Sequence, residues 1–345
     1  MSVFVDILIN LWRFLRNVYT RLLKRPPGYV AFEVSGSLPE FEDRVGFIRR
    51  RLSPGPPAPS LEGLRRRLEL ISGDGRVRGV VLRIQALDAG WASLEELRSE
   101  LAAFREGGGR VVAYLVEADT RSYYLACAAD EVLAAPLATV GVVGVRTRTD
   151  FLKDALGRIG IEAEIFAVSP YKSAGERFTR RDFSPEAREQ AERLQDRRYG
   201  ELVRAISEGR NMDPEEVRSK IDGAPYGAKE ALAEGLLDGV CYEVELPGRL
   251  GSPEEPANVA EWERARGSLR VPYRKSPRWR VGVVSLSGTI VRGRSRKLPV
   301  PLPLFGREQA GSESVVAALR MAEKNHRVSA VLFRVDSRGG DSLAS

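Results

Sequence analysis

Continuous apolar runs alternate with amphipathic segments along most of this chain. Each short apolar run, typical of a buried strand, is followed by a stretch whose apolar residues recur every three or four positions, which predicts a helix. The expected strands are residues 29–38, 77–84, 110–117, 131–136, 139–145, 163–168, 280–290 and 327–335. The expected helices are residues 61–71, 93–108, 150–160 and 314–325, with a mainly helical stretch from 184 to 234. This alternation predicts an α/β fold with a largely parallel sheet.

Residues 3–23 have the pattern of an amphipathic helix. Polar positions recur every three or four residues from Asp6 to Lys24, opposite a continuous apolar face. A bilayer span needs about 20 mostly apolar residues, and the internal arginines make one costly. With Trp12 and Tyr19 at headgroup depth, we expect a helix that lies in the membrane plane. A helix docked on the protein's own body or on a partner is the alternative. No small-residue cleavage site follows the segment, so we do not expect a removable secretory signal.

The carboxy-terminal part begins the pattern of the amino-terminal part again. Ser287-Gly288 answer Ser35-Gly36 at the ends of corresponding apolar runs, and residues 327–335 match residues 76–84 at an offset of 251 (327 minus 76). Two unrelated strand–helix–strand units could share a hydrophobic pattern. The shared order, spacing and identities favour a duplication.

The repeat predicts four parts of the chain. They are a membrane-anchor helix at 1–25, a complete α/β repeat at 26–246, a linker at 247–277 and the start of a second, incomplete repeat at 278–345. The second copy lacks a counterpart of residues 94–245. We expect either a fragment or truncated product, or a second half that another polypeptide completes.

Composition narrows the possible chemistry. The 345-residue chain is 43% hydrophobic with a net charge of +7, but its basic residues alternate with acids, so solvated helix faces account for them and no nucleic-acid partner is expected. A Ser-His-Asp triad or a histidine-rich zinc site would have to use the single histidine, His326, which lies between a predicted helix and strand. Cys127 and Cys241 are too few for a disulfide framework or a Cys-rich metal site, and Cys127 is predicted to be core. We expect no metal and no cofactor, and a hydrolytic base that is a carboxylate or a lysine.

Lys172 is the candidate for such a base. Lysine is scarce beside arginine in this chain, and Lys172 closely follows the predicted strand 163–168 and Pro170. A desolvated lysine can become a neutral amine and act as a base or nucleophile, which arginine cannot do near neutral pH. A solvated loop lysine is the alternative, and spacing alone favours it.

Several motifs together resemble the signal peptide peptidase A, or protease IV, family of serine peptidases. They are YKSAGERF (171–178), RRDFSPEAREQ (180–190), EGRNMDPEEV (208–217), DGAPYGAKEALAEGLLDG (222–239) and FRVDSRGGDS (333–342), and the resemblance runs from about Tyr29 to the end of the sequence. It implies a crotonase- or Clp-protease-like fold, which long members carry as a tandem repeat. It also implies a Ser-Lys dyad, with the general base from the first copy and the nucleophile from the second.

The resemblance assigns roles to particular residues. Lys172 is the implied general base, and Gly339 and Gly340 are the implied oxyanion turn, for which a plain strand-to-helix turn is the alternative. Arg338 stands where the family usually has proline. The nucleophile is unknown and expected beyond Ser345, because the matching turn in the first copy has Thr120 in the place of the serine. Ser122, two residues on, is expected to cap a helix or to pack.

The implied function is that of a membrane-associated serine endopeptidase. It would cleave hydrophobic peptides such as released signal peptides and assemble as a homo-oligomer, and this chain alone is predicted to be inactive. A catalytically inactive membrane scaffold or assembly subunit is an alternative, as is a crotonase-type acyl-CoA enzyme. The expected location is the cell membrane, peripheral or monotopic.

Two further expectations stay open. Lys24 and Arg25 favour the cytoplasmic side by the charge rule, whereas the family resemblance suggests the outer side. Residues 292–306 have a basic start and a Pro-spaced apolar tail. They fit a membrane-facing lip, a partner-binding stretch or, as the plainer expectation, a disordered loop.

Overall fold

The computed structural model describes residues 2–41, 60–275, 277, 279–302 and 306–345. Contacts divide the chain into two compact units: residues 13–272, and residues 1–12 together with 273–345. Each unit is described by itself. The predicted Pro-rich loop before Ser60 lies outside the described residues.

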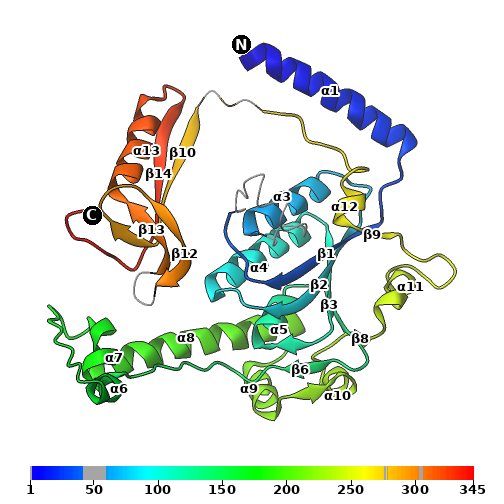
Figure 1. The fold of residues 1–345 in the computed structure, drawn as a ribbon. Coiled ribbons are helices and arrows are strands. Elements are labelled where there is room, and N and C mark those ends of the chain that lie inside the picture. The colour runs from blue at the N-terminus through cyan, green and yellow to red at the C-terminus, as the bar shows by residue number, and fades with distance from the viewer. Residues whose placement is uncertain (1, 42–59, 276, 278, 303–305) are drawn as a thin grey trace. The chain divides into compact units, whose positions relative to one another are not determined.

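A parallel sheet forms the centre of the larger unit (Figure 1). Its strand order is β8-β5-β3-β2-β1-β9, and every neighbouring pair is parallel. The strands are β1 (Tyr29–Gly36), β2 (Gly79–Leu87), β3 (Arg110–Leu115), β5 (Glu131–Ala134), β8 (Gly239–Val240) and β9 (Val259–Glu261). The predicted α/β fold with a parallel sheet is confirmed.

Helices connect these strands, and three of them begin at a residue that caps the helix. Ser60 caps α3, Ser184 caps α8 and Asp213 caps α9, each by accepting a backbone N–H of the first turn. The helices are α3 (Leu61–Ser72), α4 (Trp91–Glu106), α5 (Thr120–Ala126), α8 (Pro185–Arg210), α9 (Pro214–Gly223), α10 (Ala228–Ala233), η2 (Glu243–Glu245), α11 (Leu246–Leu250) and α12 (Trp262–Ala265). A small second sheet joins β4 (Ala118–Asp119), β6 (Thr139–Gly141) and β7 (Tyr226–Gly227).

Both faces of the main sheet are buried. Val30 and Phe32 of β1 join the core that α3, α4, α5 and α8 cover, whereas Tyr29 and Ala31 join a second cluster with Leu246 of α11. Successive strand residues point to opposite faces, so two-sided burial requires the continuous apolar runs seen in the sequence.

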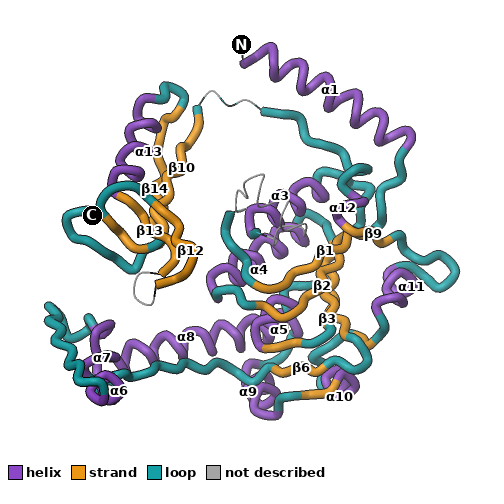
Figure 2. The backbone as a smooth tube through the Cα atoms, viewed as in Figure 1, coloured by secondary structure: helices purple, strands orange, loops and turns teal. Residues whose placement is uncertain are grey.

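The predicted strand at 163–168 is wrong. Figure 2 shows loop on both sides of α6 (Lys153–Arg158), followed by the short η1 (Ser173–Gly175) and α7 (Glu176–Thr179). Phe166 is 95% exposed and Val168 is 92% exposed. An apolar run becomes a strand only when a neighbouring strand takes its backbone hydrogen bonds, and no described strand pairs with this one. The strand expected at 139–145 is also shorter, ending at Gly141.

The segment expected to be a linker, 247–277, is structured in its first part. Its β9 pairs with β1 as the edge of the main sheet, and α12 follows directly. The boundary between the two units falls later, after Pro272.

The smaller unit contains a parallel pair of strands, β10 (Arg280–Ser287) and β14 (Val328–Asp336), connected through α13 (Ser312–Lys324). In this pair, Val281 of β10 lies opposite Ala330 of β14. In the corresponding pair of the larger unit, Tyr29 of β1 lies opposite Gly79 of β2. Gly288 has a φ of 91° and Gly36 a φ of 65°, the left-handed region that favours glycine. The two strand ends therefore turn in similar ways.

A second sheet in this unit has the order β11-β13-β12. It contains β11 (Thr289–Val291), β12 (Arg296–Leu302) and β13 (Gly306–Gly311). Within the described part of residues 292–306, the expectation of a disordered loop is wrong, because β12 pairs with β13 in antiparallel fashion.

The amino-terminal segment is a helix, α1 (Ser2–Leu23), as predicted. The boundary between the two units falls within it, after Trp12. None of the helices in the described part of the chain combines the length and the apolarity that crossing a bilayer requires.

Candidate active site

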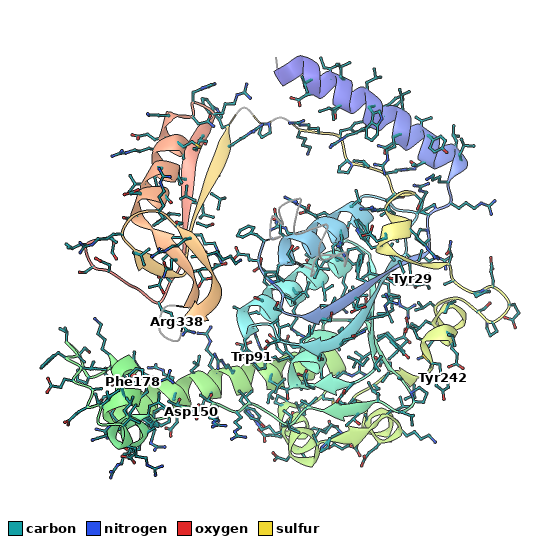
Figure 3. All side chains as sticks on the ribbon, viewed as in Figure 1. Tyr29, Trp91, Asp150, Phe178, Tyr242 and Arg338 are labelled. Carbon is teal, nitrogen blue, oxygen red and sulfur yellow. The ribbon has the colours of Figure 1, made fainter. Side chains whose placement is uncertain are left out.

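Lys172 lies in a small module at the amino-terminal end of α8. Phe151 and Phe183 meet edge to face at 5.2 Å, the N–H of Leu152 donates to the carbonyl of Arg177, and Arg181 pairs with Asp154 at 2.9 Å. In Figure 3, Phe178 marks this module and Asp150 marks the chain that leads into it. The module therefore has its own contacts, separate from the main core.

The two neighbours of Lys172 are tethered to α8. The Tyr171 hydroxyl donates to Glu189 at 2.9 Å, and the Gln190 amide donates to the carbonyl of Tyr171 at 3.2 Å. The Ser173 hydroxyl donates to the side-chain oxygen of Gln190 at 3.3 Å. Lys172 is thus presented from a loop that is fixed on both sides.

Glu176 fixes the other end of this loop. Its carboxylate accepts the Ser184 hydroxyl at 2.7 Å and the Ser184 N–H at 3.1 Å. Sequence reasoning gave no role to Glu176, Glu189 or Gln190. The signal that could have found them is their position inside the neighbouring motifs 171–178 and 180–190. Side chains of two motifs so close in sequence can form hydrogen bonds with each other.

The Lys172 side chain is exposed and lines an open cavity of about 350 Å³ together with Ile165, Pro170 and Glu176. Among the described ion pairs, none involves Lys172. Glu189 lies about 20 Å along α8 from Val203, where the helix enters the core. The expected desolvation of Lys172 is therefore not present in the contacts of this chain by itself.

The Gly339–Gly340 turn belongs to the smaller unit. Gly339 has a φ of 102°, and its N–H donates to the Ser337 hydroxyl at 3.1 Å. Among the hydrogen bonds of the described residues, none uses the N–H of Gly340. A Cβ on Gly340 would overlap the backbone of Ile290, with which Gly340 forms a bridge. One of the two expected donors is thus occupied and the other is available.

Thr120 and Ser122 are engaged in structural contacts. The Thr120 hydroxyl donates to the carbonyl of Gly144, and the fully buried Ser122 hydroxyl donates to the carbonyl of Gln85, both at 3.2 Å. Asp119, not Ser122, caps α5. Ser122 therefore packs, which was one of the two expected roles.

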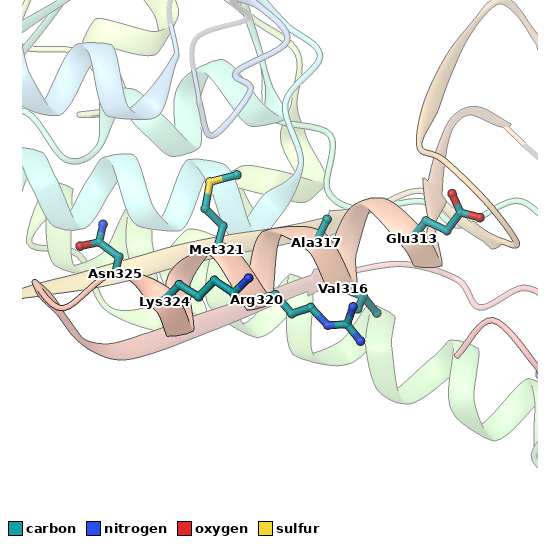
Figure 4. A pocket seen from close by; sticks show the side chains of 7 residues that line it. All are labelled: Glu313, Val316, Ala317, Arg320, Met321, Lys324 and Asn325. Atoms are coloured by element: carbon teal, nitrogen blue, oxygen red, sulfur yellow. The ribbon is translucent and has the colours of Figure 1, made fainter.

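The other candidate groups do not assemble a site. His326 is exposed in the turn after α13, and no metal-binding cluster of His, Cys, Asp or Glu occurs in the described ranges. Burial raises the pKa of Cys127 to about 11, as expected for a core thiol. A hollow of about 680 Å³ is lined by one helix, α13 (Figure 4), with Arg320, Met321 and Lys324 among its residues. It is the open surface of a single helix and holds no paired nucleophile and base.

Comparisons with known proteins confirm the resemblance inferred from the motifs. Residues 103–249 match the model of Peptidase family S49. The chain is 28% identical to the chloroplastic serine protease SPPA of Arabidopsis thaliana, over 79% of this chain and 40% of that protein. It is 28% identical to Protease 4 of Haemophilus influenzae, over 79% of this chain and 45% of that protein. It is 25% identical to Protease 4 of Salmonella typhi, over 92% and 53%.

The chain spans about half the length of the curated relatives it matches. A solved structure of a mutant of the 1510-N membrane-bound stomatin-specific protease shares 10% identity, with a TM-score of 0.39 over 68% of this chain and 95% of that one. The crotonase- or Clp-protease-like fold stays a prediction at this level of similarity.

Proposed function

The chain is a relative of the signal peptide peptidase A family through its Peptidase family S49 segment, and from this premise we propose that it is the lysine-bearing part of a serine peptidase. One observation carries the proposal. Lys172 lies inside the matched residues 103–249 and is held, exposed, between two neighbours tethered to α8.

The proposed chemistry is that of a Ser-Lys dyad. The neutral Lys172 amine takes the proton of a serine hydroxyl as the oxygen attacks a peptide carbonyl, and returns it to the leaving amine. The N–H of Gly340 is the proposed donor to the oxyanion, and a donor of this kind is typically worth about 3 kcal/mol. The serine belongs to a segment outside residues 1–345, so this chain by itself is proposed to be inactive.

Desolvation of Lys172 is proposed to come from the surface that brings the serine. Val281 of β10 pairs with Ala330 of β14, and Tyr29 of β1 pairs with Gly79 of β2. This similarity between the two strand pairs supports a tandem repeat, in which one copy brings the lysine and the other brings the serine. A homo-oligomer is the proposed assembly, and hydrophobic peptides such as released signal peptides are the proposed substrates.

The test uses a polypeptide that includes the serine-bearing segment. Lys172→Ala and Lys172→Arg should each lower kcat for a hydrophobic peptide at least about a thousandfold, because arginine keeps the charge but cannot act as a base. Lys153→Ala removes another exposed lysine of the same module and should leave kcat unchanged. Circular dichroism and the melting temperature check that all three variants fold.

Retained cleavage in Lys172→Arg would refute the dyad. The inactive scaffold is the second candidate, favoured by the exposed position of Lys172. It predicts that no version of the protein cleaves peptides, with or without Lys172.

A further inference from the structure

The burial of α1 is the reverse of that in the amphipathic helix α3. In α3, Leu64, Leu68 and Ile71 are buried and the charged side chains face out. In α1, Thr20 is buried and Asn17 half-buried, whereas the apolar side chains are the exposed ones. The exposed face contains Leu8, Leu11, Trp12, Leu15, Tyr19 and Leu22, which are 50–75% exposed. The polar face of α1 is therefore the one that is docked on the protein.

Two asparagines, one full heptad apart, dock this polar face. Asn17 donates its amide N–H to the carbonyl of Val271 at 2.9 Å and accepts the Val271 N–H at 2.9 Å. Asn10 donates to the carbonyl of Arg274 at 3.0 Å and accepts the Arg274 N–H at 2.7 Å. Each side-chain amide thus satisfies both backbone groups of one residue, as a neighbouring strand would. We call these four bonds the asparagine clamp.

Further contacts hold α1 in the same orientation, with its polar face toward the protein. Arg13 donates to the carbonyl of Pro272 at 2.6 Å, and Arg16 donates to the carbonyl of Arg266 at 3.2 Å. Arg76, itself held by Asp74, donates to the carbonyl of Thr20 at 3.2 Å. Contacts from Asn10 to Thr20 all lie on one side of α1, so rotation of the apolar face toward the protein would break them together.

The charge of this region favours an anionic partner. Residues 2–25 and 266–275 contain nine basic residues, five in the first range and four in the second, against one acidic residue, Asp6. Asp6 is paired with Arg274 at 3.1 Å. The region therefore carries nine minus one, or +8, whereas the whole chain carries only +7. Arg21, Lys24 and Arg25 are exposed at the end of the helix.

We propose that the apolar face of α1 docks on an anionic lipid bilayer, and that the asparagine clamp holds this face outward before lipid is met. Apolar side chains enter the acyl boundary, Trp12 and Tyr19 lie at headgroup depth, and the basic cluster attracts anionic headgroups. A preset face removes the cost of reorienting the helix at the bilayer. The inference does not depend on peptidase activity.

The test is sedimentation of the 345-residue chain with vesicles. Equimolar phosphatidylcholine and phosphatidylglycerol should bind the wild-type chain, with binding that falls as salt rises, and phosphatidylcholine alone should bind it more weakly. Leu15→Glu should weaken partition at least about tenfold. Val244→Glu, a matched change at a residue 85% exposed in η2, should leave partition unchanged.

Two further readouts locate the contact and test the clamp. Anionic vesicles should shift tryptophan emission to the blue, and Trp12→Phe should remove that shift. Asn10→Ala combined with Asn17→Ala should lower the hydrogen-exchange protection of α1 in the lipid-free chain at least about tenfold. Leu15→Glu should keep this protection, which shows that its loss of binding is not loss of the helix.

Three results overturn the proposal. They are no binding of wild type to anionic vesicles, equal binding by Leu15→Glu, or unchanged exchange when both asparagines are removed. A lipid-free oligomer that Leu15→Glu dissociates, without vesicle binding by wild type, would instead identify the face as an interface between copies.

Discussion

At the scale of single residues, the loop that carries Lys172 shows how a reactive group can be exposed yet fixed. Tyr171 and Ser173 bond to Glu189 and Gln190 of α8, and Glu176 bonds to Ser184 at the start of that helix. The amine of Lys172 is left exposed to meet a partner group. Positioning of this kind reduces the entropy that is lost when a catalytic pair forms.

Asp74 is the residue whose charge stabilises the larger unit most clearly. It is fully buried, pairs with Arg76 at 2.7 Å and accepts the N–H of Arg270 at 3.0 Å. Burial by itself raises the pKa of Asp74, but these hydrogen bonds and the Arg76 charge outweigh it, so the pKa is lowered. The stabilisation is therefore present above the usual Asp pKa of about 4 and is lost as pH falls through the lower folded value.

We predict that Asp74→Asn destabilises the protein by about 3 kcal/mol at pH 7, because it leaves the Arg76 charge without its partner. Urea unfolding at several pH values measures this. The variant should also lose less stability than wild type between about pH 5 and about pH 3, the range around the ordinary Asp pKa. Asp88→Asn, whose side chain is 93% exposed, is the control and should change stability little. Equal effects of the two substitutions would contradict the prediction.

At the scale of elements, α8 connects the Lys172 module to the core. Its first half contacts the module through Glu189 and Gln190, and its second half buries Leu202, Val203 and Ile206. The helix begins at the Ser184 cap with proline next to it and ends at Asn211, whose φ of 52° is left-handed. One continuous helix therefore connects the module to the core.

Two glycines of α8 provide a matched pair of variants. A Cβ on Gly209 would overlap the backbone carbonyl of Cys127, whereas a Cβ on Gly200 meets nothing within 4 Å. We expect Gly209→Ala to destabilise the protein by about 2 kcal/mol, because the close approach of α8 to Cys127 is lost. Gly200→Ala should stabilise it by up to about 1 kcal/mol through helix propensity. Thermal unfolding measures both, and a stabilising Gly209→Ala would rule out the close approach.

At the scale of the whole molecule, the two units differ in core. Both clusters of buried apolar side chains belong to the larger unit. In residues 273–345, the buried hydrophobic residues among those described are Val284 and Ala310, and Leu332 and Val335 of β14 are 58% and 57% exposed. Burial of apolar surface is the main stabilising contribution to folding, so the smaller unit should be the less stable one.

We therefore predict that the units open separately in the 345-residue chain. Native-state hydrogen exchange followed by mass spectrometry should show β10 and β14 exchanging at least about a hundredfold faster than β2 and β3. Denaturant should raise exchange in the smaller unit first. Equal protection of all four strands, or one shared transition, would show that the units fold as one.

The sequence predicted most elements of this molecule because their signals are local. The runs that became β1, β2, β3 and β5 needed only continuous apolar character, and the starts of α3 and α8 needed only Ser60 and Ser184. The motif around Lys172 was also readable, and the resemblance it indicates is confirmed by the match of residues 103–249 and by the relatives. The roles of Lys172, Gly339 and Gly340 stay predictions, since a role in a dyad depends on a second surface.

The sequence alone determined which residues are apolar, which segments have helical or strand periodicity, and where caps begin helices. Only the tertiary structure decided which of those surfaces meet. Phe166 and Val168 have the composition of a strand but remain exposed because no described strand pairs with them. Asn10 and Asn17 fit an amphipathic pattern, but their bonds to Arg274 and Val271 turn the polar face of α1 inward. Periodicity defines the two faces of a helix, whereas contacts between residues more than 250 positions apart decide which face is covered.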